Sequence, residues 1–316
     1  MIHIPVMKTE VLEALNPQPG EFFVDGTLGG GGHAELICER IKKAGRLLVI
    51  DVDVKAIENF RSNVKCQMSN VTAVRDNFKN LPDILAREKL GKADGFLLDL
   101  GLSSDELTAS GRGFSFQVNE PLFMTLEDDT VPVMAILRTH SEEQLAEIIK
   151  KYGEERYANR IAGEIKNTLR RKPIETTFDL RDAVLRATPR AKRRGNIHPA
   201  TRTFMALRIY ANHEYENLAS ALRALPRIVK DGGRVAVITF HSGEDRIVKN
   251  IFRDFARAGT LLLINKKVIV PTREEVRENP RARSAKLRAA VIGVKQSGVS
   301  GGAFAVRPAS ILYSHY

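Results

Sequence analysis

The sequence predicts an α/β protein with a doubly wound sheet, on two observations about its first hundred residues. Short apolar runs, typical of strands buried on both faces, recur along this region. Segments whose apolar residues follow helical spacing separate the runs. Strands joined by helices of this length form right-handed crossovers, so the strands lie parallel and helices cover both faces of the sheet.

Four strands are expected in this region, over residues 21–25, 46–51, 71–74 and 94–101. Apolar residues at the 3.6-residue repeat indicate two of the intervening helices: Leu36, Ile37, Ile41 and Ala44, and then Ile57, Phe60 and Val64. Such a helix returns the chain to the start of the next parallel strand.

The pattern changes between about residues 105 and 200, where no buried strand is evident. Residues 142–171 predict one long helix or two, with Gly153 as the expected break. Thr176 and Asp179 have the spacing of a capping box for a helix over 179–187. This stretch is interpreted as a helical module inserted into the α/β domain.

Strand signals resume towards the C-terminus. Residues 225–242 contain the end of a helix, a D-G-G turn and an apolar strand, RVAVITF. Residues 266–271 and 286–295 predict two further strands. The expected organisation is an α/β domain formed by 1–104 and 203–296, a helical domain over 105–202, and a loosely attached tail over 297–316.

The chain is strongly basic, with a formal net charge of +11 and a pI near 9.7. Its basic residues cluster in 169–173, 189–196 and 279–288, as a surface that follows a phosphate backbone requires. This favours polyanionic partners, because each neutralised phosphate releases counterions. The alternative is a basic surface that only keeps the protein soluble. Aromatic residues are sparse and tryptophan is absent, which disfavours base stacking along an extended single strand.

The composition, with 43% hydrophobic and 28% charged residues, is typical of a soluble globular protein. The N-terminus lacks the features of a signal peptide, and no apolar run approaches the roughly 18 residues of a membrane span. Cys38 and Cys66 have neither metal-binding nor redox spacing. They are expected to be reduced, with a disulfide as the alternative. We therefore expect a cytoplasmic protein.

The segment DGTLGGGGH, residues 25–33, places four consecutive glycines between a strand and a helix. Unpaired helix N–H groups and a backbone without Cβ atoms can approach a ligand there. A P-loop would need Lys followed by Ser or Thr, where this chain has His33 and Ala34. Gly29, Gly31 and Ala34 formally match the dinucleotide-binding pattern, which is weak evidence by itself.

Two acidic residues narrow the choice of ligand. Asp51 ends the second strand, where a carboxylate can accept hydrogen bonds from both ribose hydroxyls of NAD or S-adenosylmethionine. Asp25, directly before the loop, would repel a pyrophosphate but suits a ligand with an ammonium and a sulfonium group. This favours S-adenosylmethionine. The alternative is that Asp25 caps the loop and Asp51 caps a helix.

Asp99 ends the fourth strand, at the edge where ligands of open α/β sheets bind. Here the chain resembles the RsmH (MraW) family. The resemblance is collinear from residue 3 to about 292 and rests on eight motifs: HIPV at 3–6, VDGTLGGGGH at 24–33, LLDLGLSS at 97–104, RGFSF at 112–116, YGEER at 152–156, HPATRTFMALRI at 198–209, GGRVAVITFHSGEDRIVK at 232–249 and NPRARSAKLR at 279–288.

The resemblance implies a class I S-adenosylmethionine-dependent methyltransferase, with a seven-stranded sheet and an inserted helical domain. It implies methylation of the N4 amine of a cytidine in the decoding region of 16S ribosomal RNA, within the small ribosomal subunit. Carried over by position, the cofactor contacts are Gly31, Gly32, His33, Asp51, Phe78, Asp99 and Glu106. Phe78 is expected beside the adenine, with ordinary core packing as the alternative.

The chain departs from the family's pattern at several positions. Glu106 and Met205 each replace Gln, and Gly243 replaces Leu. Phe123 and Thr125 replace an acid and a base, which indicates either a salt bridge lost jointly or altered docking of the RNA. The methyl-donor motifs are intact, so these departures concern the substrate more than the cofactor.

Candidate catalytic residues follow the strands. Asp99, Ser103 and Ser104 are candidate acceptors for the substrate amine, and His241 is a candidate proton acceptor. The serines have the alternative role of capping a helix, and His241 that of a structural donor. No cluster of His, Cys and Asp has metal-ligand spacing, so no metal is expected.

Four arginines are candidate phosphate contacts, with a solvated basic face as the alternative: Arg112, Arg194, Arg281 and Arg283. Asp245 and Arg246 are expected either to pair locally or to contact the substrate. The alternatives to the rRNA methyltransferase are a methyltransferase of another RNA, a non-catalytic ribosome-assembly factor and a nicotinamide-dependent oxidoreductase. The sequence is compatible with a homodimer.

Overall fold

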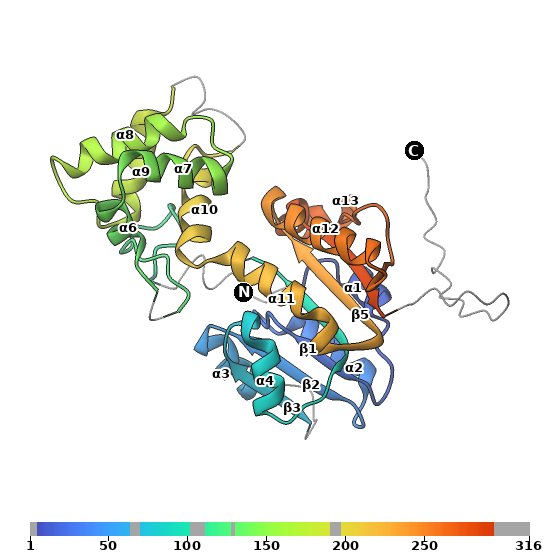
Figure 1. Ribbon diagram of the computed structural model, residues 1–316. Coiled ribbons are helices and arrows are strands. Elements are labelled where there is room, and N and C mark those ends of the chain that lie inside the picture. The colour runs from blue at the N-terminus through green and yellow to red at the C-terminus, as the bar shows by residue number, and fades with distance from the viewer. Residues whose placement is uncertain (1–4, 64–69, 102–110, 128–129, 190–196, 294–316) are drawn as a thin grey trace.

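The computed structural model describes residues 5–63, 70–101, 111–127, 130–189 and 197–293 of the 316-residue chain. Figure 1 shows an α/β domain and a group of helices connected to it by α10 (Ala200–Ala211) and α11 (Glu214–Ile228). Within the described ranges, no helix has both the length and the apolar character needed to cross a membrane.

The α/β domain is built on a seven-stranded sheet with the order β3-β2-β1-β4-β5-β7-β6. The strands are β1 (Phe22–Asp25), β2 (Arg46–Asp51), β3 (Val71–Arg75), β4 (Ala93–Asp99), β5 (Val229–Thr239), β6 (Leu261–Leu263) and β7 (Lys286–Ile292). β3, β2, β1, β4 and β5 pair in parallel, and β7 is antiparallel to both of its neighbours. The predicted doubly wound class is confirmed.

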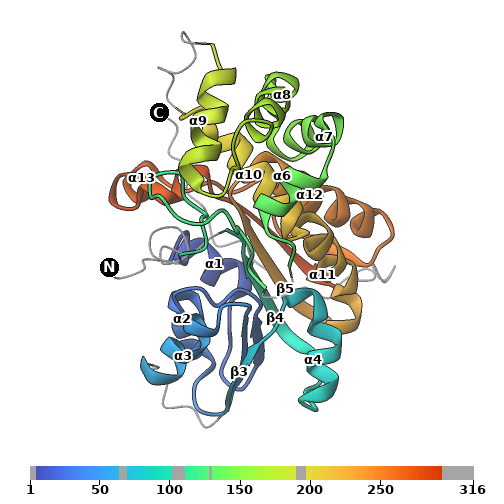
Figure 2. The same ribbon diagram turned by 90° about the vertical axis from the view of Figure 1, so that its left-hand side faces the viewer.

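Helices cover both faces of the sheet, because side chains on successive strand residues point to opposite faces and both sets are apolar. Phe22 and Val24 of β1 belong to one core cluster, and Phe23 belongs to the other. One face is covered by α1 (Lys8–Leu15), α2 (Gly32–Ile41) and α3 (Val54–Asn63), and the other by α4 (Leu81–Arg87), α11 and α12 (Ser242–Arg257). Figure 2 shows the two layers on either side of the strands.

The last part of the sheet differs from the expectation in three places. The strand predicted over 266–271 is wrong: within this segment only Ile269 makes a bridge, to Leu287 of β7. β6, which the sequence did not indicate, pairs with the other end of the same edge of β7. The sequence D-G-G was predicted as a turn but lies within β5, where three extra residues bulge opposite the step from Ala93 to Gly95.

The expectation of two reduced cysteines is not met at Cys38 of α2, which is disulfide-bonded in the structure. The predicted tail over 297–316 lies outside the described residues.

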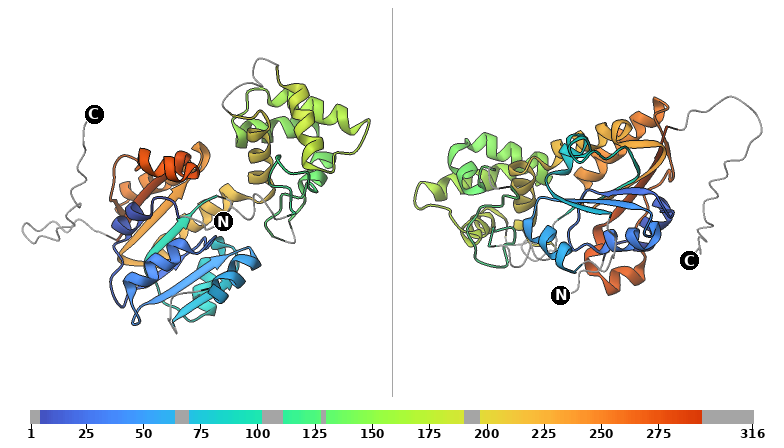
Figure 3. Two further views of the ribbon diagram at one scale, coloured as in Figure 1. Left: turned by 180° about the vertical axis from the view of Figure 1, so that it is seen from behind. Right: turned by 90° about the horizontal axis from the view of Figure 1, so that it is seen from below.

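The group of helices has a hydrophobic core of its own, formed by residues between Phe114 and Ala211. Its helices are α6 (Val133–Thr139), α7 (Glu142–Gly153), α8 (Ala158–Leu169), α9 (Thr177–Ala187) and α10. Figure 3 shows from two further sides that this module projects from one end of the α/β domain. The expected boundaries of the domains, at residues 104 and 202, stay a prediction.

Residues 142–171 form two helices, with the break after Gly153 as expected. Glu154 adopts a left-handed conformation there, with φ of 50°, and ends α7. A Cβ atom on Gly153 would lie 2.6 Å from the carbonyl oxygen of Arg202, so glycine is needed where α7 crosses α10. The tight crossing fixes α10, which carries several residues of the site described below.

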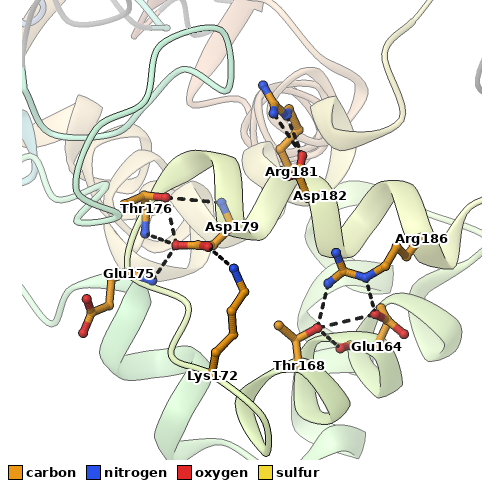
Figure 4. A network of polar contacts seen from close by, with 9 residues as sticks. All are labelled: Glu164, Thr168, Lys172, Glu175, Thr176, Asp179, Arg181, Asp182 and Arg186. Carbon is orange, nitrogen blue, oxygen red and sulfur yellow. Dashed lines mark hydrogen bonds and ion pairs between the residues drawn. The ribbon is translucent and has the colours of Figure 1, made fainter.

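The predicted capping box at the start of α9 is confirmed (Figure 4). The Thr176 hydroxyl accepts a hydrogen bond from the Asp179 N–H, and the Asp179 carboxylate accepts one from the Thr176 N–H. Lys172 Nζ lies 2.7 Å from the same carboxylate, and Arg186 pairs with Glu164 of α8 at 2.6 Å. These contacts hold α9 against the preceding helix.

We expect Thr176→Ala to lower the free energy of unfolding by about 1 kcal/mol, because the first turn of α9 loses its side-chain acceptor. Urea denaturation followed by circular dichroism measures the change. Thr139→Ala, which removes an exposed hydroxyl at the end of α6, is the matched control. Equal effects of the two substitutions would contradict a stabilising role for the cap.

Candidate functional site

A cavity of about 510 Å³ lies at the carboxyl edge of the sheet, between the α/β domain and the helical module. This is the edge at which ligands of parallel α/β sheets bind. The α/β domain lines it with residues that follow β1 to β5, among them Gly26, Gly29, Gly32, His33, Asp51, Asp76, Phe78, Asp99 and His241. The helical side contributes Phe114, Phe116, Thr201, Phe204, Met205 and Arg208.

The glycine loop is an ordered turn between β1 and α2. Gly29 and Gly31 have φ angles of 49° and 78°, in the left-handed region that glycine adopts without strain. Leu28 N–H donates to the carbonyl of Ile50, which ties the loop to β2. Gly32 lines the cavity, whereas Gly31 is the N-cap of α2 and does not line it. The loop therefore presents backbone to the cavity at a fixed place.

Asp51 joins the glycine loop to the end of β2. Its Oδ2 accepts a hydrogen bond from Gly29 N–H at 2.8 Å, and its Oδ1 accepts one from Asp53 N–H at 2.9 Å. Each carboxylate oxygen has a further lone pair, so Asp51 can also accept hydrogen bonds from a ligand in the cavity. Asp51 can therefore hold the backbone in place and bind a ligand at the same time.

Phe78 lies in the short 3₁₀ helix η1 (Phe78–Asn80), which follows β3. It is partly buried against the core of the sheet and also lines the cavity. Asp76 and Asn77, directly before it, line the cavity as well. Sequence reasoning missed Asp76, although an acid directly after a third parallel strand is the same signal that identified Asp51.

Asp99 lines the cavity and has a strongly raised pKa. Burial, with the charge of Glu244 as a smaller contribution, raises its pKa to about 7. Its backbone N–H donates to the Thr27 hydroxyl at 2.6 Å, and His33 Nε2 lies 3.6 Å from its Oδ2. Its Oδ1 has no hydrogen-bond partner among the described residues. Asp99 is therefore a carboxyl group at the cavity with one enclosed oxygen that has no hydrogen-bond partner among the described residues, a combination typical of functional sites.

Asp25 does not line the cavity, contrary to the direct ligand contact that the sequence favoured. It is fully buried beneath the loop, and its Oδ1 accepts a hydrogen bond from Thr27 N–H at 3.2 Å. Burial, together with the charges of Asp99 and Asp51, raises its pKa well above the usual range. Its contact with the loop is the capping role considered as the alternative.

His241 and Glu244 lie together at the start of α12 and both line the cavity. The His241 side chain accepts a hydrogen bond from Glu244 N–H, and its Nε2 is 3.0 Å from Glu244 Oε1. Burial alone would raise the pKa of Glu244, but contact with His241 and the Phe240 N–H outweighs burial and lowers it. Sequence reasoning missed Glu244, because a Glu three residues after an N-cap ordinarily indicates only a helix start.

The other candidate residues lie in different places, and some pair with other parts of the chain. Arg281 lines the cavity, whereas Arg283 is exposed outside it and Arg112 donates to the carbonyl of Leu126. Asp245 pairs with Arg288 at 2.7 Å, and Arg246 pairs with Glu154, so each makes a salt bridge with another element. Four candidates lie outside the described residues: Ser103, Ser104, Glu106 and Arg194.

The positions that depart from the family pattern lie mostly away from the cavity. Met205 lines it, whereas Phe123 and Thr125 do not. Phe123 is 39% exposed and Thr125 is partly buried, so both positions lie outside the cavity and Phe123 lies on the surface. A Cβ atom on Gly243 would lie 1.7 Å from the Tyr215 hydroxyl oxygen, which explains why this chain has no leucine there.

The helical wall of the cavity was not predicted. Arg208 of α10 makes a bidentate ion pair with Glu214, with nitrogen–oxygen distances of 2.7 and 2.9 Å. Asn212 is buried beside it, accepts from Leu126 N–H, and donates to the Met124 and Arg208 carbonyls. No group of three or more His, Cys, Asp or Glu side chains in the described ranges could hold a metal ion.

The chain matches the model of the MraW methylase family over residues 1–292. It is 44% identical over 300 residues to the ribosomal RNA small subunit methyltransferase H of Coprothermobacter proteolyticus, covering 95% of this chain and 97% of the relative. Its identity to the protein of the same name from Geobacter sulfurreducens is 44%, covering 91% and 98%. An rRNA methylase from Streptococcus thermophilus superposes with a TM-score of 0.44 at 9% identity, covering 92% and 98%.

We expect Asp99→Asn to stabilise the protein more at pH 8 than at pH 5, by roughly 2–3 kcal/mol. The folded protein keeps the Asp99 proton up to about pH 7, whereas the unfolded chain releases it near its model value of 3.8. Stability of the wild type therefore falls as the pH rises through this window, and the neutral amide removes that loss. Urea denaturation at both pH values measures the difference.

The matched control is Asp83→Asn, which removes an exposed carboxylate of α4. An equal stability change of Asp99→Asn at pH 5 and pH 8 would show that Asp99 is ionised throughout this range.

Proposed function

The chain belongs to the MraW methylase family, and from this premise we propose that it methylates the N4 amine of a cytidine in the decoding region of 16S ribosomal RNA. It is an S-adenosylmethionine-dependent rRNA methyltransferase, as its relatives' names imply. One observation of the structure supports the proposal most: the glycine loop that follows β1 and the acids that end β2 and β4 line one cavity together with the aromatic wall of the helical module.

The residues at the sheet edge fit S-adenosylmethionine. We assign Asp51 to the ribose hydroxyls and Phe78 to the adenine, and both side chains belong to residues that line the cavity. The methionine end is assigned to the backbone of residues 26–29, which lines the cavity. Gly26 also packs closely on the core, because a Cβ atom there would lie 2.7 Å from Leu98. The unused Oδ1 of Asp99 suits a positively charged or donor group.

When bound, S-adenosylmethionine supplies a methyl group on a positively charged sulfur. Cytosine N4 is a weak nucleophile because its lone pair is delocalised into the ring. We assign Asp99 the role of accepting a hydrogen bond from this amine, which holds it in place and stabilises the charge that develops there. His241 stays the candidate for receiving the proton that the amine loses. Its Nδ1 would take that proton in exchange for the hydrogen bond from Glu244 N–H, while Nε2 stays beside the Glu244 carboxylate. Ser103 stays a prediction.

The proposal includes the setting of the reaction. The basic clusters of the chain suit an RNA folded within the small ribosomal subunit, and Arg281 at the cavity is assigned to a phosphate of that RNA. A cytoplasmic location follows from this substrate. A homodimer stays a prediction, which sedimentation of the purified protein tests.

The deciding experiment supplies labelled S-adenosylmethionine with assembled small subunits, naked ribosomal RNA and DNA, and identifies the modified nucleoside by mass spectrometry. We expect N4-methylcytidine in the RNA of the small subunit. Asp99→Asn should lower the rate by about 100-fold or more, because the amide cannot offer a charged acceptor. Label on DNA alone, on another nucleoside, or on no nucleic acid would overturn the proposal.

We expect Asp51→Ala to weaken the binding of S-adenosylhomocysteine by about 10–100-fold, the loss typical of hydrogen bonds to a charged group. Asp51→Asn keeps one acceptor oxygen and should lie between the two. Isothermal titration measures both, with Asp83→Ala on the surface of α4 as the matched control. Unchanged affinity of Asp51→Ala would remove Asp51 from the ribose site.

A further inference from the structure

The helical wall of the cavity carries a group of aromatic side chains, although aromatic residues are sparse in this chain. Aromatic residues make up 6% of the sequence, and tryptophan is absent. Phe116 nevertheless stacks on His198 with ring centroids 4.6 Å apart and an angle of 17° between the planes. Phe204 of α10 meets Phe116 edge to face at 5.4 Å. Phe116 and Phe204 both line the cavity.

Phe116 differs from a core residue in its burial. Phe204 is 4% exposed and belongs to the core of the helical module, whereas Phe116 packs against that core and is only partly buried. Two rings hold Phe116 in one orientation, and the cavity lies beside it. A fixed ring with accessible surface in a cavity is the arrangement that proteins use to stack a nucleobase that has left its helix.

The stacked partner keeps this surface neutral. Burial, with the nearby charge of Arg181, lowers the pKa of His198, so the imidazole is uncharged at neutral pH. Its Nδ1 accepts a hydrogen bond from Ala200 N–H at 3.2 Å, which fixes the ring at the start of α10. The stack is therefore attached to the helix that carries Phe204, Met205 and Arg208 towards the cavity.

The two walls of the cavity have different chemistry. The sheet edge carries carboxylates and glycine backbone, which suit the polar parts of the methyl donor. The helical wall is aromatic and apolar at Phe114, Phe116, Phe204 and Met205. A flat heterocycle with a polar edge would place its faces against the rings and direct its edge towards Asp99.

We propose that Phe116, held between His198 and Phe204, is the stacking surface for the target pyrimidine of the RNA. This inference rests on the proposed function, since it names where the base of that same substrate binds. The base leaves its paired or folded position, stacks on Phe116 and turns its exocyclic amine towards the sheet edge. Phe116 is a binding residue for the base and takes no part in the proton transfer.

The absence of tryptophan makes a direct test available. Phe116→Trp creates the single indole of the chain, whose emission reports on its surroundings. We expect small-subunit ribosomal RNA to quench this emission, because a base stacks on the indole. Inorganic polyphosphate, which carries charge without bases, should quench it by less than a fifth as much. Equal quenching by both polyanions, or none by the RNA, would overturn the proposal.

A second measurement separates stacking from packing. Phe116→Leu keeps an apolar side chain but no ring, and should raise the KM for the RNA substrate by about tenfold or more. Phe116→Tyr should remain within about threefold of the wild type. Phe255→Leu, at a partly buried phenylalanine of α12 outside the cavity, is the matched control. Thermal unfolding of all three variants establishes that they are folded.

The affinity for S-adenosylhomocysteine shows whether the Phe116 ring contacts the RNA base or the cofactor. We expect Phe116→Leu to bind it as the wild type does, within about twofold. A loss of tenfold or more would assign Phe116 to the adenine of the cofactor, and an unchanged KM would leave it a packing residue; either result overturns the proposal. Failure of the proposed function is distinct, because the wild type would then leave the RNA unmodified.

Discussion

The parallel pairing of β1 with β2 and β4 is the constraint on which the site depends. In register, Asp25 at the end of β1 lies opposite Val49 of β2 and Leu97 of β4, so Asp51 and Asp99 end their strands at the same edge. Both faces of these strands are apolar, and polar groups are confined to their ends. Burial and the charges of neighbouring carboxylates raise the pKa values of Asp25 and Asp99. The raised pKa values favour the neutral forms of both groups, and a cationic ligand at this edge would favour their ionised forms.

The helical module completes the site through a few short-range contacts. Asn212, directly after α10, holds the segment around Met124 and Leu126 by two hydrogen bonds. Glu127, next in that segment, accepts a hydrogen bond from Asn77, which follows β3. This contact bridges the helical module and the carboxyl edge of the sheet across a loop between β4 and α6. The relative position of the two walls is therefore fixed partly at the cavity itself.

Sequence reasoning predicted the sheet half of this site and missed the helical half, for a physical reason. Asp51 and Asp99 follow buried strands, and strand ends meet at one edge whatever the details of packing. Phe116, Phe204 and Arg208 come together only through the tertiary packing of the helices, which no local pattern reports. The incorrect strand at 266–271 also reflects tertiary packing. The segment has the apolar residues of a strand, but β6 pairs with part of the same edge of β7, and only Ile269 bridges to that edge. The D-G-G segment bulges from β5 because β4 offers fewer residues to pair with it.

The contact between Gly243 and Tyr215 makes two positions that are distant in the sequence depend on each other. Any side chain at position 243 would collide with the tyrosine ring, and that ring also packs against Tyr152 and His241. A larger residue at 243 would displace the ring and disturb the packing beside His241. A side chain at 243 therefore requires a smaller residue at 215, so the two positions can be exchanged only as a pair.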